Sequence, residues 1–334
     1  MKLLQYVLQR FATFLAVLLI GLTITFFIPR FMPGDPINSY ISQIQSRAGQ
    51  TLSPEAVQQM RDSLAELYGL KGSLFSQYVN FLNRVLLHFD FGPSFTNYPE
   101  KVSTILFRAL PYTAGLLLTA TVIAWSLGNL IGLISGFYNK RAWATVLELA
   151  AIMLYPIPYY ILAISLLIAL AFWIPIFPLS PTFLPGTMNW QQFKLILYNS
   201  VLPALTLVMA GFGWYVLSMK ALTVATKEEP YVEFARLKGV SNWNRMMGYV
   251  FRNAALPQVT ALVLSLGAVF SGALLTEMIF SYPGVGQLMR TAAGAGDYNL
   301  LYGAITLSII AVATAGFVLD LVYPLFDPRI RLGR

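Results

Sequence analysis

The chain alternates long apolar runs with polar segments, and six of these runs are long enough to form membrane-spanning helices. They lie near residues 9–31, 106–137, 143–174, 198–222, 256–281 and 301–325. About 30 Å of hydrocarbon requires roughly 20 helical residues. The pattern therefore predicts an all-α integral membrane protein with about six transmembrane helices, folded as a single transmembrane domain over residues 1–334.

The long segment between the first two runs, about 32–105, is the one sizeable polar part of the chain. Ser53 followed by Pro54 and Glu55 is typical of a helix start, and an apolar stripe continues from Val57 until Gly69. A second amphipathic stretch covers residues 75–86. We expect an extracytoplasmic helical insertion here.

Basic residues indicate the orientation. We expect the first run to be a retained anchor, because Phe11–Ile28 is longer than a signal-peptide core and no small-residue cleavage site follows it. With the N-terminus inside, most of the 22 Lys and Arg residues fall on cytoplasmic segments. The remaining ones lie mainly in the long segment, and long segments translocate largely regardless of charge. The sequence therefore predicts a multi-pass protein with both termini in the cytoplasm.

Composition agrees with a lipid environment and excludes several kinds of chemistry. The chain is 57% hydrophobic and only 11% charged, a surplus of apolar surface that a lipid bilayer covers. The net charge of +8 lies between apolar runs instead of on one basic face, so no nucleic acid partner is expected. With no cysteine and only His88, no multi-histidine or thiolate metal site is expected. There is no phosphate loop and no catalytic constellation, so we expect neither a cofactor nor enzymatic activity.

Glycines recur every fourth position in the second apolar run, at Gly128, Gly132 and Gly136. This spacing puts them on one helix face, where a neighbouring backbone can approach closely. The pattern predicts tight helix packing.

The most charged inside loop lies between the fourth and fifth runs and reads KEEPYVEFARLKGVSNWNRMMGYVFR over residues 227–252. Apolar side chains alternate with charges in it. A short helix here presents apolar side chains to water, which favours docking into a groove on a soluble partner. An ordinary solvated loop is the alternative.

This loop resembles the EAA loop of binding-protein-dependent ABC importer permeases of the dipeptide/oligopeptide family, in its B-type subunit. Glu233, Ala235 and Gly239 match the acidic, small and glycine positions, whereas Phe234 replaces the usual small residue. Further matches extend the resemblance over nearly the whole chain in the family's order. They are the segments LLQY near the start, PGDP at 33–36, DFG at 90–92, LP at 110–111, FSYPGVG at 280–286 and DPRIR at 327–331.

The resemblance implies a permease in a prokaryotic cell membrane that forms half of a translocation pathway for short peptides or oligosaccharides. It implies four partners: a second homologous permease subunit, two cytoplasmic ATPase subunits that hydrolyse ATP, and an extracytoplasmic solute-binding protein. The coupling loop then covers about 223–255, and the residues that couple to the ATPases are Tyr231, Glu233, Phe234, Ala235 and Gly239. Nickel complexes are a further cargo within the resemblance.

The alternative to this interpretation is a self-sufficient secondary transporter or channel, or a membrane enzyme. An ion-coupled carrier usually has charged groups at mid-membrane and repeated broken helices, and neither is evident in the sequence. An enzyme requires a catalytic constellation that the chain lacks.

Two prolines in the stretch YPIPYY at 155–160 must disturb the third predicted helix. We hypothesise that Tyr155, Tyr159 and Tyr160 line or border the translocation path, with plain helix packing as the alternative. Glu277, near the outer end of the fifth run, is a further candidate because a carboxylate in a membrane is costly and often functional.

Two other carboxylates, Glu148 and Asp320, lie near inner helix ends. For these and for Glu277 we expect contact with water or pairing with Lys140, Arg141 or Arg329.

A stiff, non-helical outer loop is expected at 175–185 because prolines recur in it. With the segment 281–296, it is a candidate docking surface for the binding protein.

Overall fold

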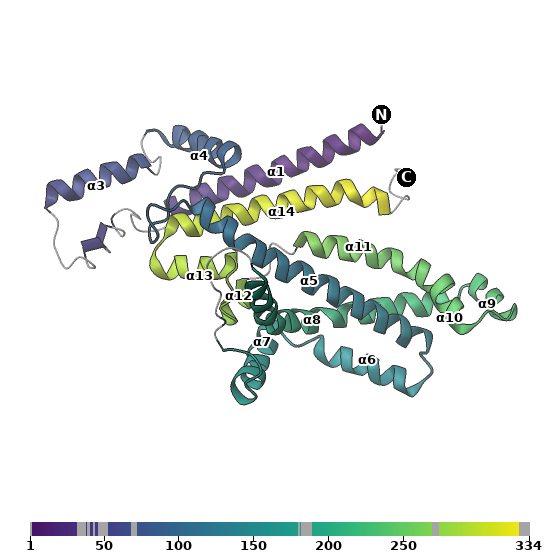
Figure 1. Ribbon diagram of the computed structural model, residues 1–334. Coiled ribbons are helices and arrows are strands. Elements are labelled where there is room, and N and C mark those ends of the chain that lie inside the picture. Colours follow the sequence, from purple (N-terminus) through teal and green to yellow (C-terminus); the bar gives the residue numbers. More distant parts are fainter. Residues whose placement is uncertain are drawn as a thin grey trace. The chain divides into compact units, whose positions relative to one another are not determined.

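The computed structural model describes residues 2–31, 53–67, 72–179, 189–268 and 274–326, with isolated positions at 38, 41, 42, 44, 45 and 181. Within these residues every regular secondary-structure element is a helix (Figure 1). One isolated antiparallel bridge joins Pro93 to Lys101. The predicted all-α membrane fold is confirmed.

Four described helices are long and apolar enough to cross a membrane. They are α1 (Lys2–Phe31), α5 (Val102–Phe137), α8 (Trp190–Lys227) and α14 (Tyr298–Phe326). A fifth span arises if α6 (Ala142–Leu154) and α7 (Tyr159–Leu167) with its π-helical continuation η1 (Ile168–Trp173) count as one crossing.

The remaining predicted span, 256–281, begins in α11 (Arg252–Ala268) and ends in α12 (Leu274–Ile279). Residues 269–273 between these helices lie outside the described part of the chain. The described residues thus supply four or five of the six predicted crossings.

The chain divides into two compact units, each built from distant parts of the sequence. Unit 1 comprises Met1–Arg10, Ala114–Tyr282 and Ala315–Arg334. Unit 2 comprises Phe11–Thr113 and Pro283–Thr314.

In unit 1 the glycine stripe of α5 packs against the backbone of α8. A Cβ atom at Gly132 would lie 2.5 Å from the carbonyl oxygen of Val216, and one at Gly136 would lie 2.9 Å from that of Lys220. No side chain fits at such distances, so glycine is required for this approach. The predicted close helix packing is confirmed.

The carboxylates near the inner helix ends have partners other than the expected ones. Glu148 of α6 forms an ion pair with Lys220 of α8. Asp320 of α14 lies 3.5 Å from the guanidinium of Arg10 on α1, and the hydroxyl of Tyr6 donates to its backbone carbonyl at 2.7 Å. Glu148 thus pairs with Lys220 instead of the expected Lys140 or Arg141, because helix packing brings this lysine of α8 closer. Both carboxylates keep part of their surface exposed, and Arg329 lies outside the described residues.

Unit 2 contains the two predicted amphipathic helices, α3 (Pro54–Leu67) and α4 (Leu74–His88), and the short helix α13 (Val285–Ala295). Ser53 caps α3 as predicted, since its hydroxyl accepts a hydrogen bond from the amide of Ala56 at 3.2 Å. Gly69, the predicted end of α3, lies outside the described residues.

A buried carboxylate joins a loop of unit 2 to the start of α14. Asp297 is fully buried, and its Oδ2 atom accepts hydrogen bonds from the Ser94 hydroxyl at 2.5 Å and from the Thr96 amide at 3.0 Å. Its Oδ1 atom accepts the amide of Leu300 at 3.0 Å and so caps α14. These bonds compensate the carboxylate for the loss of water.

Candidate functional site: the charged loop between α8 and α11

The charged loop folds into a short helix, α9 (Pro230–Leu237), held by signals within its own sequence. Pro230 occupies the first helical turn, where its missing N–H leaves no bond unmade. One turn later, Arg236 donates to Glu233 through Nε at 2.9 Å from Oε2. The pair places the negative charge near the helix start and the positive charge near its end, as the helix dipole favours.

The end of α9 depends on Gly239, which has a φ of +76°. Its amide donates to the carbonyl of Arg236 at 3.0 Å, and the amide of Val240 donates to that of Ala235 at 3.1 Å. These two bonds form a Schellman motif, which needs a left-handed residue at this position. The left-handed backbone at position 239 therefore favours glycine there.

The two faces of α9 differ in burial. Val232 and Ala235 are buried, whereas Tyr231, Phe234 and Leu237 are exposed at 41%, 58% and 73%. The exposed side chains are apolar and belong to the charged loop that follows α8. The predicted presentation of apolar side chains to water is confirmed for the described residues.

The buried face of α9 seats the helix on unit 1. Val232 belongs to an apolar cluster with Met219 of α8, and with Met246 and Val250 of η2 (Arg245–Phe251), the π-helical segment that leads into α11. The side-chain amide of Asn253 donates a hydrogen bond of 3.0 Å to the Tyr231 hydroxyl, which adds a link to α11. Helix α9 is thereby in direct contact with α8 and η2 and is hydrogen-bonded to α11.

The charges of α9 are tuned by their neighbours. The hydrogen bond from Arg236 lowers the pKa of Glu233 below its ordinary value, so this carboxylate stays ionised. Partial burial, followed by the nearby Glu229 carboxylate, raises the pKa of Tyr231, so its phenol stays protonated and keeps its hydrogen-bonding proton.

The sequence-predicted coupling residues lie in three kinds of position. Tyr231, Glu233 and Phe234 lie on the exposed surface, Ala235 is buried beneath it, and Gly239 ends the helix. Ala235 thus acts inside unit 1, because a small side chain lets α9 lie close to its neighbours.

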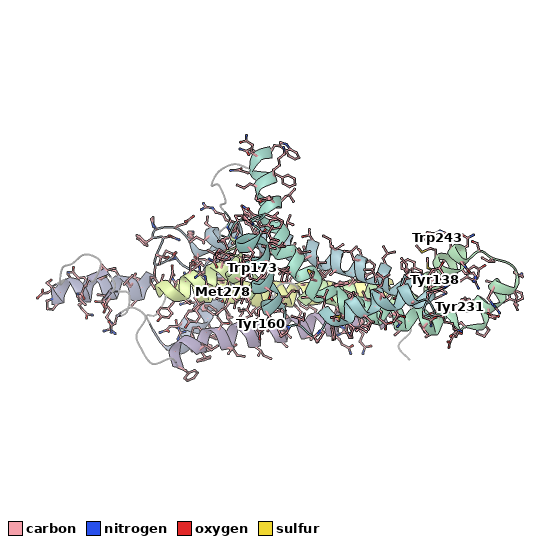
Figure 2. All side chains as sticks on the ribbon, turned by 90° about the horizontal axis from the view of Figure 1, so that it is seen from below. Tyr138, Tyr160, Trp173, Tyr231, Trp243 and Met278 are labelled. Atoms are coloured by element: carbon pink, nitrogen blue, oxygen red, sulfur yellow. The ribbon has the colours of Figure 1, made fainter. Side chains whose placement is uncertain are left out.

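Two exposed apolar side chains extend the surface beyond the predicted residues. Leu237 continues the exposed face of α9, and Trp243, in the short helix α10 (Asn242–Asn244), is 61% exposed. Figure 2 shows Trp243 and Tyr231 at the same end of unit 1, where Figure 1 places α9 and α10. The alternation of apolar and charged residues in the loop already indicated Leu237. The sequence around Trp243 did not distinguish it from a tryptophan at a membrane interface.

The tyrosines proposed for the translocation path lie at the sharp break between α6 and α7. The two helices meet at 96°, which confirms the predicted disturbance by the prolines. Tyr155 is half exposed and stacks on Trp214 of α8 with ring centroids 6.4 Å apart. Tyr159 and Tyr160 lie in the first turn of α7 with their rings edge to face at 6.3 Å, and Tyr160 is 46% exposed.

Glu277 is fully buried in α12, which packs against α7. The expectation that this carboxylate reaches water is therefore wrong in this structure. Helix α12 brings Glu277 to the helix that carries Tyr159 and Tyr160, so three of the four predicted path residues lie on two adjoining helices. Tyr155 lies on the other side of the break and turns to α8.

Two family models together cover almost the whole chain. The model described as the binding-protein-dependent transport system inner membrane component matches residues 128–332, and the N-terminal model of the same membrane component matches residues 3–117. The chain belongs to this family. It is the membrane component of an ABC importer, as the resemblance of its loop indicated.

Individual relatives align with the permease from end to end. It is 27% identical over 330 residues to a dipeptide transport system permease protein of Bacillus subtilis, with 99% of each chain covered. It is 28% identical to a probable D,D-dipeptide transport system permease protein of Escherichia coli, covering 93% of this chain and 92% of the relative. An oligopeptide transport system permease protein of Bacillus subtilis is 26% identical, with 94% and 95% covered.

Proposed function

We propose that the permease forms half of a membrane pathway for short peptides and drives it with ATP hydrolysed by separate subunits. Peptide cargo is favoured over oligosaccharides or nickel complexes because the relatives that align along its full length bear the names of dipeptide and oligopeptide systems. Membership of a binding-protein-dependent family favours this function over the self-sufficient carrier.

The proposed assembly contains a second homologous permease, two cytoplasmic ATPase subunits and an extracytoplasmic solute-binding protein. The coupling loop, about 223–255, faces the cytoplasm, and the insertion at about 32–105 faces the other side. Contacts of Arg10 and Tyr6 with Asp320 support a common side for both chain ends, since they bring the start of α1 to the end of α14. An even number of crossings, such as six, follows from this arrangement.

The observation that carries the proposal is the face of α9 formed by Tyr231, Phe234 and Leu237. Adjoining exposed apolar side chains on a loop outside the membrane are typical of a surface that another protein covers. A short helix with such a face fits a groove in a soluble ATPase. ATP binding in the partner then favours one arrangement of the groove, and α9 conveys the difference to α8 and α11.

The test is ATP-dependent uptake in liposomes that contain the assembled transporter and its binding protein. Phe234→Ala and Leu237→Ala are expected to reduce copurification of the ATPase subunits and to reduce uptake by at least about tenfold, the scale of a 1.4 kcal/mol loss in binding. The matched control is Val146→Ala on α6, which removes an equally exposed apolar side chain, 64% exposed, from a membrane helix. Normal ATPase binding by both loop variants would refute the coupling role, and uptake without any ATPase would refute the proposed function.

For the translocation path we propose the region of the α6–α7 break, with Tyr155, Tyr159, Tyr160 and Glu277. Support comes from the two half-exposed tyrosines and from the buried carboxylate on the adjoining helix. Alanine at the tyrosines is expected to change the concentration of peptide that gives half-maximal uptake. Unchanged affinity and rate in a folded complex would contradict this placement.

A further inference from the structure

Helix α4 has a buried apolar face and also exposes several large apolar side chains, although the sequence places it in a polar segment outside the membrane. Its inner face carries Phe81, Leu82 and Val85. Its outward face exposes Phe75 at 77%, Val79 at 46% and Leu87 at 72%.

The neighbouring helix α3 has the opposite character. Its exposed positions include four charged residues, Glu55, Arg61, Asp62 and Glu66. The exposed positions of α4 include no Asp, Glu, Lys or Arg. The polar exposed residues of α4 are the uncharged Ser76, Asn80 and Asn83, together with His88 at its end. Among the described side chains, large exposed apolar residues occur on α4 and not on α3.

The inner face of α4 packs against the membrane-crossing part of α1. Val85 shares a buried cluster with Leu18 and Leu22 of α1 and with Ala313 of α14. Nearer the start of α4, the hydroxyls of Tyr78 and Thr23 lie 2.6 Å apart, and Arg30 donates to the side chain of Gln77 at 2.9 Å.

These contacts fix the depth of α4. The apolar span of α1 ends at Ile28, and Leu22 lies six residues, or about 9 Å, inside that end. One leaflet contributes about 15 Å of hydrocarbon. With the hydrocarbon boundary taken at Ile28, the end of α4 lies level with the acyl chains, and Gln77, beside Arg30, lies level with the headgroups.

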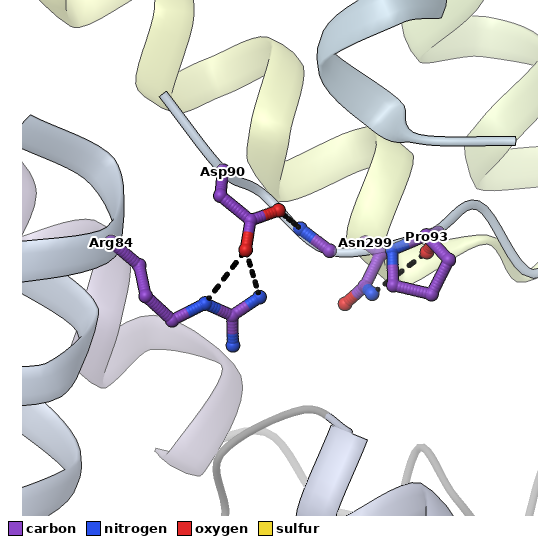
Figure 3. Close-up of polar contacts among 5 residues, drawn as sticks. Arg84, Asp90, Pro93 and Asn299 are labelled. Carbon is purple, nitrogen blue, oxygen red and sulfur yellow. Dashed lines mark hydrogen bonds and ion pairs between the residues drawn. The ribbon is translucent and has the colours of Figure 1, made fainter. Parts of the chain in front are cut away.

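The chain turns back after α4 through residues 89–101, where several polar groups have partners within the protein. Arg84 pairs with Asp90 at 3.1 Å, Asp90 accepts the amide of Gly92 at 3.1 Å, and Asn299 donates to the carbonyl of Pro93 at 2.9 Å (Figure 3). Irregular backbone is tolerated at membrane depth only with such partners. The pairing with Asp90 likewise offsets the charge of Arg84.

The spanning helices that α4 packs against or adjoins also expose apolar side chains. Ile24 and Ile20 of α1 are exposed at 53% and 60%. At the other end of α4, the ring of Phe89 lies 6.3 Å from that of Phe107, an exposed residue in α5. Large apolar side chains are thus exposed on α1, α4 and α5 within unit 2.

We propose that α4 is embedded in one leaflet of the bilayer, where Phe75, Val79 and Leu87 contact lipid and Leu87 is the deepest. The leaflet is the one at the Ile28 end of α1, and only its designation as the outer leaflet rests on the proposed topology. Helix α4 thus forms a wedge beside two spanning helices, whereas α3 remains in water. The partner of this face is lipid, on the argument from depth, and not another protein.

Site-directed spin labelling tests this placement, because the chain contains no cysteine to remove. Val79→Cys and Leu87→Cys are labelled with a nitroxide in the assembled transporter, reconstituted into phosphatidylethanolamine and phosphatidylglycerol liposomes. Ile20→Cys serves as the lipid-facing control and Gln58→Cys on α3 as the water-facing control. Only variants that retain wild-type uptake are measured, so a misfolded chain does not enter the comparison.

Collision with lipid-soluble oxygen is expected to exceed collision with a water-soluble nickel chelate at Leu87 and Val79, as at Ile20. The ratio should be larger at Leu87 than at Val79 and should reverse at Gln58. A ratio like that of Gln58 at both α4 positions would overturn the proposal in favour of water. Protection from both reagents would overturn it in favour of a protein partner. Neither outcome bears on ATP-driven uptake, so failure here is distinct from failure of the proposed function.

Discussion

The end of α9 offers the sharpest quantitative test of the coupling loop. Gly239 has a φ of +76°, and a Cβ atom built on it meets no atom within 4 Å. Gly239→Ala therefore introduces no clash, and its whole cost is that of a left-handed backbone, about 1–2 kcal/mol. A cost of this size increases the open population of the last turn of α9 by roughly 5- to 30-fold.

Hydrogen exchange of the intact permease measures that population. The amide of Val240, which donates to Ala235, is expected to exchange faster by the same factor in Gly239→Ala. Gly239→Asn should give a smaller effect, because asparagine adopts the left-handed region more readily. ATP-dependent uptake should fall in the same order, since the turn holds the exposed face of α9 in place.

Gly248 supplies a matched control for this series. It is also exposed, and a Cβ atom placed on it would lie in open space, but its φ is not in the left-handed region. Gly248→Ala should therefore leave exchange and uptake unchanged or slightly improve stability. Equal effects at the two glycines, or unchanged exchange in Gly239→Ala, would refute the assignment of Gly239 to backbone conformation.

Three further predictions follow from contacts described above. Gly132→Ala places a methyl 2.5 Å from a carbonyl oxygen and should lower stability by about 1–3 kcal/mol in thermal unfolding in detergent, whereas Gly115→Ala, with open space on the same helix, should not. Asp297→Ala leaves several buried donors without their acceptor and should lower the free energy of unfolding by roughly 2–4 kcal/mol in the same assay. A change below about 0.5 kcal/mol would contradict a stabilising role for the hydrogen bonds of Asp297. Because the hydrogen bond from Arg236 lowers the pKa of Glu233, its stabilising contribution is complete above the ordinary value of 4.5 and is lost as pH falls through the lowered value. The carboxyl carbon shift of Glu233 in NMR should titrate at higher pH in Arg236→Gln, and an unchanged titration would show that the bond does not form.

The sequence determined those features that depend on neighbours within a few residues. Apolar run length identified the membrane class, since hydrocarbon thickness sets helix length. Periodicity located α3 and α4, and the glycine spacing predicted close packing of α5. Charge and aromatic alternation singled out the α9 loop, because a short helix displays side chains three and four positions apart together.

The tertiary structure decided what depends on contacts between distant segments. It paired Glu148 with Lys220 and Asp320 with Arg10, and it buried Ala235 and Glu277. It also placed α4 against α1, a contact that its composition alone did not reveal. Burial and ion pairing depend on which helix faces meet, and this choice arises from packing over the whole bundle, so a local pattern cannot fix it.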